Sequence, residues 1–174
     1  MSLSLSHLSQ PIFEQMLNSL SLVLDKAEEH AKARKIDPSV LLNSRLYPDM
    51  FPFTRQVQIA CDFAKNTSSR LAGVDVPKYA DDEQSFAALK ERIAKTLAFL
   101  KTLDHVAIDN AVERDITFPV GPMSVTMKGR PYLLHFAMPN FYFHHSMDYA
   151  ILRHNGVDIG KRDFLGTIPG FPKM

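Results

Sequence analysis

The residues best suited to chemistry in this 174-residue chain interrupt otherwise apolar stretches. Between residues 131 and 154, apolar residues recur at steps of three and four, the spacing of one helix face. The series is Leu133, Phe136, Ala137, Asn140, His144, Met147 and Ile151. Asn140 and His144, its only polar members, lie four residues apart and are therefore neighbours on that face. An inward-facing imidazole suggests metal ligation or general-base catalysis.

A second polar pair, Gln58 and Asp62, borders the apolar positions Val57, Cys61 and Ala64. Its members are also four residues apart, and a buried carboxylate or amide requires partners. Facing helices that direct carboxylates and histidines inward are the usual metal sites of helical bundles. We therefore expect one polar pocket built by Gln58, Asp62, Asn140 and His144.

Each of these residues also has a purely structural interpretation. His144 is then a core histidine satisfied by hydrogen bonds. Gln58 and Asp62 are then a solvated boundary, and Asn140 bonds a backbone carbonyl beside Pro139. The sequence leaves both interpretations open.

Neighbouring aromatic and histidine residues extend this region. Tyr142 lies between Phe141 and Phe143, an aromatic cluster expected to pack in the core, with Tyr142 lining the pocket. His145 falls on another face of the same helix, where exposure or helix capping is expected.

Four helix-periodic segments must position these residues, at about 10–35, 52–71, 85–103 and 131–154. A short helical turn is expected around 38–42. Between the third and fourth helices, two strand-like runs flank a Gly-Pro turn in 113–129 and predict a hairpin with Pro119 on an edge strand. Pro139 should bend the last helix, and the tail should pack as an irregular strap through Phe164 and Leu165. The prediction is an all-α four-helix bundle with a small β-hairpin between helices three and four, forming a single domain over 1–174.

Composition narrows the classes of partner. The 20 Lys and Arg against 19 Asp and Glu give a net charge of +1, so no nucleic-acid partner is expected. The single cysteine, Cys61, excludes an internal disulfide and favours a reduced, cytoplasmic location. We identify no signal peptide and no apolar run near the ~20 residues that span a bilayer, so no membrane partner is expected.

Three segments carry a family resemblance: RLYPDMFPFTRQVQIACDFAK (45–65), MPNFYFH (138–144) and LRHNGVDIGKRDFLG (152–166). Together with HHSMDYAILRHNG (144–156), they resemble the DinB/YfiT-like superfamily of metalloenzymes. The resemblance is closest to a bacterial branch of domain-of-unknown-function proteins and spans nearly the whole chain.

The superfamily's usual site is three histidines, one on the second helix and two four apart on the last helix, holding nickel or zinc. The resemblance makes His144 the second of the last-helix pair, but Asn140 stands at the first position. The second-helix position falls among Gln58, Cys61 and Asp62, none of which is histidine. A ligand set of His144, Asp62 and Asn140 is oxygen-rich and suits a harder divalent ion. The alternative is a metal-free polar pocket.

Characterised superfamily members include thiol-dependent S-transferases, whose metal lowers the pKa of a thiol cofactor. The resemblance therefore implies a metal-assisted transferase with a small-molecule substrate, with His144 as the catalytic residue in a pocket beneath the hairpin. Without an ion, His144 would act as a general base tuned by Asp62. The alternative function is a non-catalytic, metal-free small-molecule-binding or scaffold protein. Superfamily members are often homodimers, so self-association is also expected.

Overall fold

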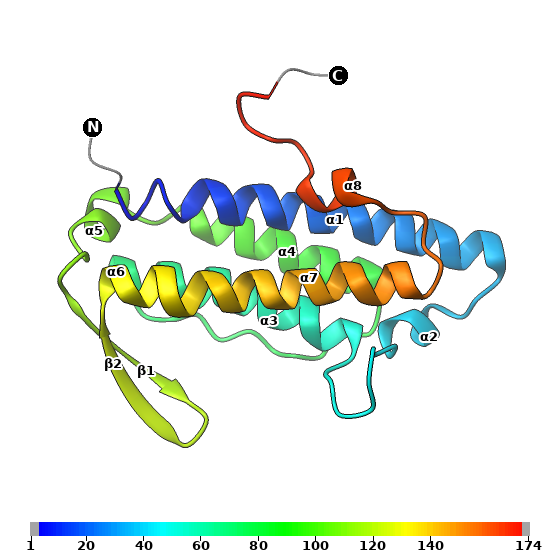
Figure 1. The fold of residues 1–174 in the computed structure, drawn as a ribbon, viewed down its shortest axis with the longest axis horizontal. Coiled ribbons are helices and arrows are strands. Elements are labelled where there is room, and N and C mark those ends of the chain that lie inside the picture. The colour runs from blue at the N-terminus through cyan, green and yellow to red at the C-terminus, as the bar shows by residue number, and fades with distance from the viewer. Residues whose placement is uncertain (1–3, 172–174) are drawn as a thin grey trace.

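Four long helices dominate the computed structural model, which describes residues 4–171. They are α1 (Gln10–Arg34), α3 (Phe53–Ala72), α4 (Phe86–Leu100) and α7 (Met138–His154), and they run alongside one another (Figure 1). Helix α3 packs against both α7 and α4, and α1 packs against α4 and α7. Their apolar faces share one buried core. All four helices were predicted from the three-and-four spacing. The ends of the first three lie within three residues of the predicted positions, whereas α7 begins seven residues later than predicted.

The helix ends follow local chemistry. Pro11 lies in the first turn of α1, where its missing N–H interrupts no helical hydrogen bond. Gly73 ends α3 in the left-handed region at φ 74°, a conformation that glycine adopts without strain. Helix α7 ends at His154 with Asn155 as its C-cap residue, and Gly156 follows with φ 86°.

The shorter elements connect these helices. They are α2 (Pro38–Leu42), α5 (His105–Asp109), β1 (Asp115–Val120), β2 (Met123–Lys128), α6 (Gly129–Pro131) and α8 (Lys161–Leu165). Helix α5 was not predicted, although Asp104 caps it by accepting a hydrogen bond from the Val106 N–H at 2.9 Å. The tail predicted as an irregular strap contains α8, because Asp163 accepts a hydrogen bond from the Gly160 N–H at 2.8 Å.

The predicted hairpin is present as a two-stranded antiparallel sheet of β1 and β2. Ile116 and Phe118 point to one face of β1 and are buried against the core. Pro119 lies opposite Ser124, in a sheet with no central strand to disrupt. The chain is therefore mostly helical with one small sheet that extends away from the long helices (Figure 1).

The helix leading into α7 departs from the prediction. Residues Tyr132–Ala137 form a π-helical segment, η1, in which the Met138 N–H donates to the Leu133 carbonyl five residues back. Pro139 follows at once and has no N–H to continue the usual pattern. The wider turn inserts an extra residue and rotates the downstream face relative to a regular helix. The buried residues of α7 are Met138, Phe141, His144, His145, Asp148, Ile151 and Leu152.

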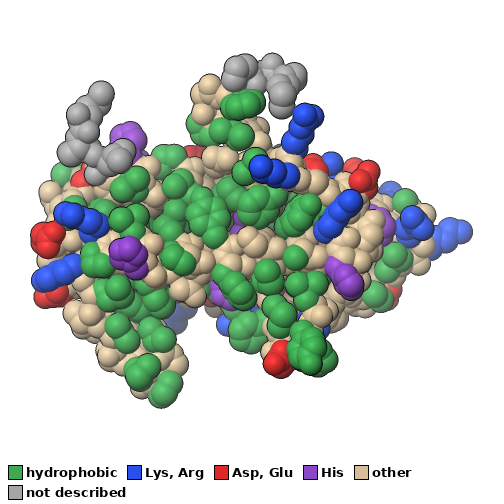
Figure 2. Space-filling model, in the orientation of Figure 1, with side chains coloured by type: hydrophobic (Ala, Val, Ile, Leu, Met, Phe, Trp, Pro, Cys, Tyr) green, Lys and Arg blue, Asp and Glu red, His purple; other side chains and the backbone are tan. Residues whose placement is uncertain are grey.

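The outer surface of α7 keeps large apolar side chains. Figure 2 shows hydrophobic side chains spread along the face that carries this helix. Tyr142 and Phe143 of α7 are both exposed. Among residues 4–171, no helix has the length and apolar content needed to cross a membrane.

Candidate functional site

His144 lies on the face of α7 that packs against α3. Its Nδ1 is 2.7 Å from Oε1 of Gln56, and its ring stacks on Phe63 with the centroids 5.7 Å apart. The Gln56 Nε2 donates to the Phe51 carbonyl at 3.2 Å, so its Oε1 must be the acceptor. His144 therefore carries its proton on Nδ1 and leaves Nε2 as an acceptor.

The environment of His144 keeps the ring neutral. Burial, assisted by the positive charge of Arg55, lowers the pKa of His144 to about 4. At neutral pH the imidazole is thus uncharged.

Gln58 and Asp62 lie on the side of α3 that faces α4 and residues 79–83. Asp62 Oδ1 is 2.9 Å from Arg92 Nη2 and 2.9 Å from Lys65 Nζ. Gln58 accepts a hydrogen bond from Arg55 Nη1 at 3.1 Å and donates to Glu83 Oε2 at 2.8 Å. Neither side chain bonds to His144.

Arg92 is the centre of this arrangement. Its side chain is 1% exposed, and its guanidinium contacts Glu83 Oε1 at 2.9 Å and donates to the Ala80 carbonyl at 3.1 Å. Lys65 Nζ also lies 4.1 Å from the centre of the Tyr79 ring. We call Arg55, Gln58, Asp62, Lys65, Glu83 and Arg92 the Arg92 network.

Asn140 and Tyr142 occupy two further environments. The Asn140 Nδ2 donates to the Phe136 carbonyl at 2.7 Å, within the turn that joins η1 to α7. This is the structural role that the sequence offered as an alternative. Tyr142 is 37% exposed, its ring meets Phe141 edge-on, and partial burial raises the pKa of its phenol. The expected four-residue pocket is therefore divided between the α7–α3 contact, the Arg92 network and the η1–α7 turn.

The donors do not fit a three-ligand metal site. Within residues 4–171, no group of three or more His, Cys, Asp or Glu side chains is placed to share an ion. Asp62, the one carboxylate of the predicted set, already holds two cations at 2.9 Å. An ion bound at Asp62 would therefore lie close to two positive charges, which would repel it.

His145 was expected to be exposed or capping, and this is wrong. It is 2% exposed, its ring stacks on Phe164 of α8 at 4.7 Å, and neither ring nitrogen has a hydrogen-bond partner of normal geometry among the described residues. Burial lowers the pKa of His145 to about 4, outweighing the nearby Phe164 carbonyl, which favours the protonated ring.

Asp148 was not singled out from the sequence. It is fully buried, and both carboxyl oxygens lack hydrogen-bond partners among residues 4–171. Burial raises the pKa of Asp148 well above its usual range. One sequence signal was available, since Phe141, His145, Asp148 and Leu152 also follow steps of four, three and four. Gln56 had a similar signal, because Gln56, Ala60 and Phe63 are four and three residues apart.

Cys61 is buried. Burial raises the pKa of its thiol to about 12. The thiol is therefore protonated and unreactive at neutral pH.

A cavity of about 500 Å³ adjoins the Arg92 network between α2, the start of α3 and residues 81–84. Its wall is mainly polar and comprises Ser39, Leu42, Asn43, Pro52, Thr54, Arg55, Gln58, Asp81, Glu83 and Gln84. The hairpin contributes no residue to this wall, so the pocket with Gln58 does not lie where the sequence placed it. We call this space the α3 cavity.

The arrangement of helices and the small sheet define a DinB-like protein. The fold is similar to the crystal structure, at 1.83 Å resolution, of a DinB family member protein from Shewanella denitrificans. The TM-score is 0.88 and the sequence identity is 42%, covering 95% of this chain and 94% of that chain.

Residues 5–165 match the family model described as a domain of unknown function, DUF1993, and the chain belongs to that family. No curated protein matches the sequence. The resemblance to DinB-like proteins of unknown function is thereby confirmed.

Proposed function

We propose that this protein binds a small polar molecule in the α3 cavity without a metal ion. The observation that carries the proposal is the chain of hydrogen bonds that runs along the cavity wall from Arg55 through Gln58 to Glu83. Arg92 holds Glu83 from behind, so the wall is already ordered before a ligand arrives. Ordering in advance lowers the entropic cost of binding.

The wall specifies the chemistry of the ligand. Arg55 supplies a cation that pairs with Asp81, while Glu83 and Asp81 supply carboxylates. A partner with both donors and acceptors, such as a zwitterion or a compound with several amides, complements such a wall better than a phosphate ester. A volume of about 500 Å³ lies within the range of small-molecule sites.

We also propose that the four long helices constitute the four-helix bundle of the DinB fold, with the hairpin as a cap at one end. The support is the packing of α3 on α7 and α4 and of α1 on α4 and α7. In this arrangement His144 and Gln56 form an internal contact between two bundle helices, not a ligand for substrate.

The competing function is the metal-assisted transferase implied by the resemblance. One observation favours it: His144 is neutral, with Nε2 free to accept, which is the form that ligates metals. The cations around Asp62 argue against it.

Two measurements on untagged protein separate the functions. The first is elemental analysis after purification without chelators, for which we expect substoichiometric nickel, zinc and manganese. The second is a titration with small zwitterionic and amide compounds, followed by amide NMR shifts. We expect shifts at Thr54, Arg55 and Gln58, and at least tenfold weaker binding in Gln58→Leu.

Asn18→Leu is the matched control, because Asn18 is exposed on α1 and bonds only the Glu14 carbonyl. It should bind as the wild type does. Stoichiometric metal that disappears in His144→Ala would overturn the proposal. So would a ligand that binds Gln58→Leu as tightly as the wild type, with the same amide NMR shifts.

A further inference from the structure

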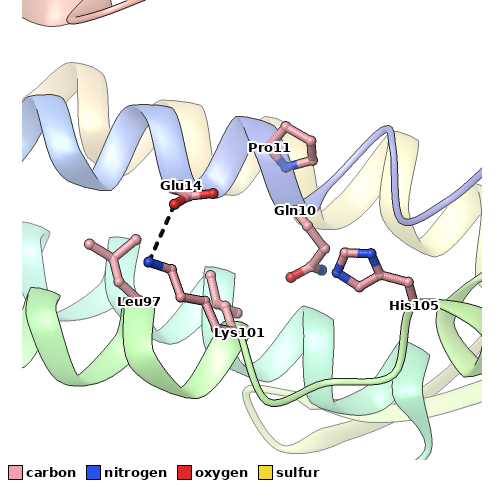
Figure 3. A pocket seen from close by; sticks show the side chains of 7 residues that line it. Gln10, Pro11, Glu14, Leu97, Lys101 and His105 are labelled. Carbon is pink, nitrogen blue, oxygen red and sulfur yellow. Dashed lines mark ion pairs between the residues drawn. The ribbon is translucent and has the colours of Figure 1, made fainter. Parts of the chain in front are cut away.

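A second, smaller cavity lies between the start of α1, the end of α4 and α5. Its volume is about 250 Å³, and Pro11, Leu97 and Leu100 provide apolar wall (Figure 3). It shares no lining residue with the α3 cavity.

The Gln10 side chain enters this space with one hydrogen-bonding atom unused. Gln10 is 7% exposed, and its Nε2 donates to Ser68 Oγ at 3.0 Å and to Ser9 Oγ at 3.2 Å. Its Oε1 has no partner among residues 4–171. Figure 3 shows the amide directed into the gap between α1 and α4, beside His105.

The neighbours of Gln10 determine which end of the amide points into the cavity. The Ser9 hydroxyl donates its only hydrogen to the Leu5 carbonyl at 2.7 Å. Ser9 Oγ can therefore only accept from Gln10, which places the amide nitrogen at the serines and the oxygen in the gap. A buried carbonyl oxygen without a donor is costly, so a donor that reaches it is bound favourably.

A second acceptor lines the same cavity. Glu14 pairs with Lys101 at 3.7 Å, and the two side chains are 50% and 69% exposed. A pair this long and this exposed is held weakly. The Glu14 carboxylate is thus available to another cation.

From these contacts we propose that this cavity binds a small primary alkylammonium compound. The ammonium donates to Gln10 Oε1 and pairs with Glu14, and the alkyl group covers Leu97 and Leu100. The Gln10 oxygen is shielded from solvent in the unliganded protein. Two lining side chains, Lys101 and His105, are exposed, and His105 lies beside the Gln10 amide in Figure 3, so rotation of its ring opens a path.

The test uses the full chain and three probes of equal alkyl length: n-butylammonium, n-butanol and pentanoate. Amide NMR shifts at Leu97, Leu100 and His105 report binding. We expect saturable binding of the amine, at least fivefold weaker binding of the alcohol, and none of the carboxylate. Glu14→Gln should weaken amine binding at least fivefold, and Gln10→Leu more than that.

The controls keep the outcome interpretable. Glu28→Gln changes an exposed carboxylate of α1 that does not line the cavity and should bind as the wild type does. Glu14→Gln changes only a rim residue, so it remains informative if Gln10→Leu fails to fold. Equal binding of amine and alcohol, or an unchanged affinity in Glu14→Gln, would overturn the proposal. Gln58→Leu should have no effect here, which separates this site from the α3 cavity.

Discussion

Arg92, between α3 and α4, and two polar residues on the buried face of α7, His145 and Asp148, are all shielded from water but differ in their partners. Arg92 is 3% exposed and contacts carboxylates and a carbonyl, whereas His145 and Asp148, at 2% and 0%, lack hydrogen-bond partners among the described residues. Where an opposite charge is within reach, a buried group keeps its charge. Where none is, burial drives the group to its neutral form.

This difference separates two kinds of stability. The Arg92 network stabilises the fold through ion pairs and should be damaged by the loss of one member. His145 and Asp148 of α7 stabilise the fold only while they stay uncharged, so their contribution to stability depends on pH.

The largest expected effect is the loss of the network's central cation. Arg92→Met removes the guanidinium that pairs with Glu83 and Asp62. The substitution should reduce the free energy of unfolding by about 3–5 kcal/mol. Urea denaturation near neutral pH measures it. Arg130→Met, which removes an exposed pair with Glu113, is the control and should cost less than about 1 kcal/mol. An equal loss of unfolding free energy in Arg92→Met and Arg130→Met would contradict the central role of Arg92 in the network.

Acid should weaken the α7 region through His145. Its pKa lies at about 4 in the folded protein, below its ordinary value of 6.5. Between these values the unfolded chain binds the proton and the folded chain does not, so stability falls as pH drops from 6.5 to 4. The loss should reach about 3 kcal/mol relative to His145→Phe, which keeps the ring stacked on Phe164 but cannot titrate. Parallel acid dependence in both proteins would count against this account.

Asp148 should act in the opposite direction. Because its folded pKa is raised, the unfolded chain loses the proton first, and stability falls as pH rises above the ordinary value of 3.8. The slope relative to Asp148→Asn should approach about 1.4 kcal/mol per pH unit. Denaturation of both proteins at several pH values tests it, and a pH-independent difference would refute it.

The smallest effect is expected at the turn between η1 and α7. Asn140→Ala removes the hydrogen bond to the Phe136 carbonyl and should cost about 0.5–1.5 kcal/mol. Binding in the α3 cavity should be unchanged, because Asn140 does not line it. If Asn140→Ala weakened ligand binding without lowering stability, Asn140 would belong to the binding site and the account would be wrong.

The elements of the fold were largely predictable because they depend on local spacing. Apolar residues at steps of three and four identified the long helices, and Gly73 marked the end of α3. The short helix α5 was missed, since five residues show too little periodicity to identify. The equally short α2 was predicted from its proline and capping residues and not from periodicity.

The candidate site was less predictable, because it depends on how helices are rotated against one another. A regular period through 131–154 places Asn140 on the buried face, but the π-helical turn before Pro139 centres that face on Phe141 and Asp148. On α3, adjacent polar residues face different neighbours, with Gln56 towards His144 and Gln58 towards Glu83. Choosing between them requires the positions of α4 and α7, which no residue of α3 encodes.

The central claim is that Asp62 and His144 belong to separate regions and do not share an ion. A double-mutant cycle of Asp62→Asn and His144→Asn, measured by denaturation with and without nickel or zinc, tests it most directly. If the two regions are independent, the loss of unfolding free energy in the double variant should equal the sum of the two single losses to within about 0.5 kcal/mol, with or without metal. Coupling clearly above that value, present only with metal and accompanied by metal-dependent stabilisation of the wild type, would contradict the account.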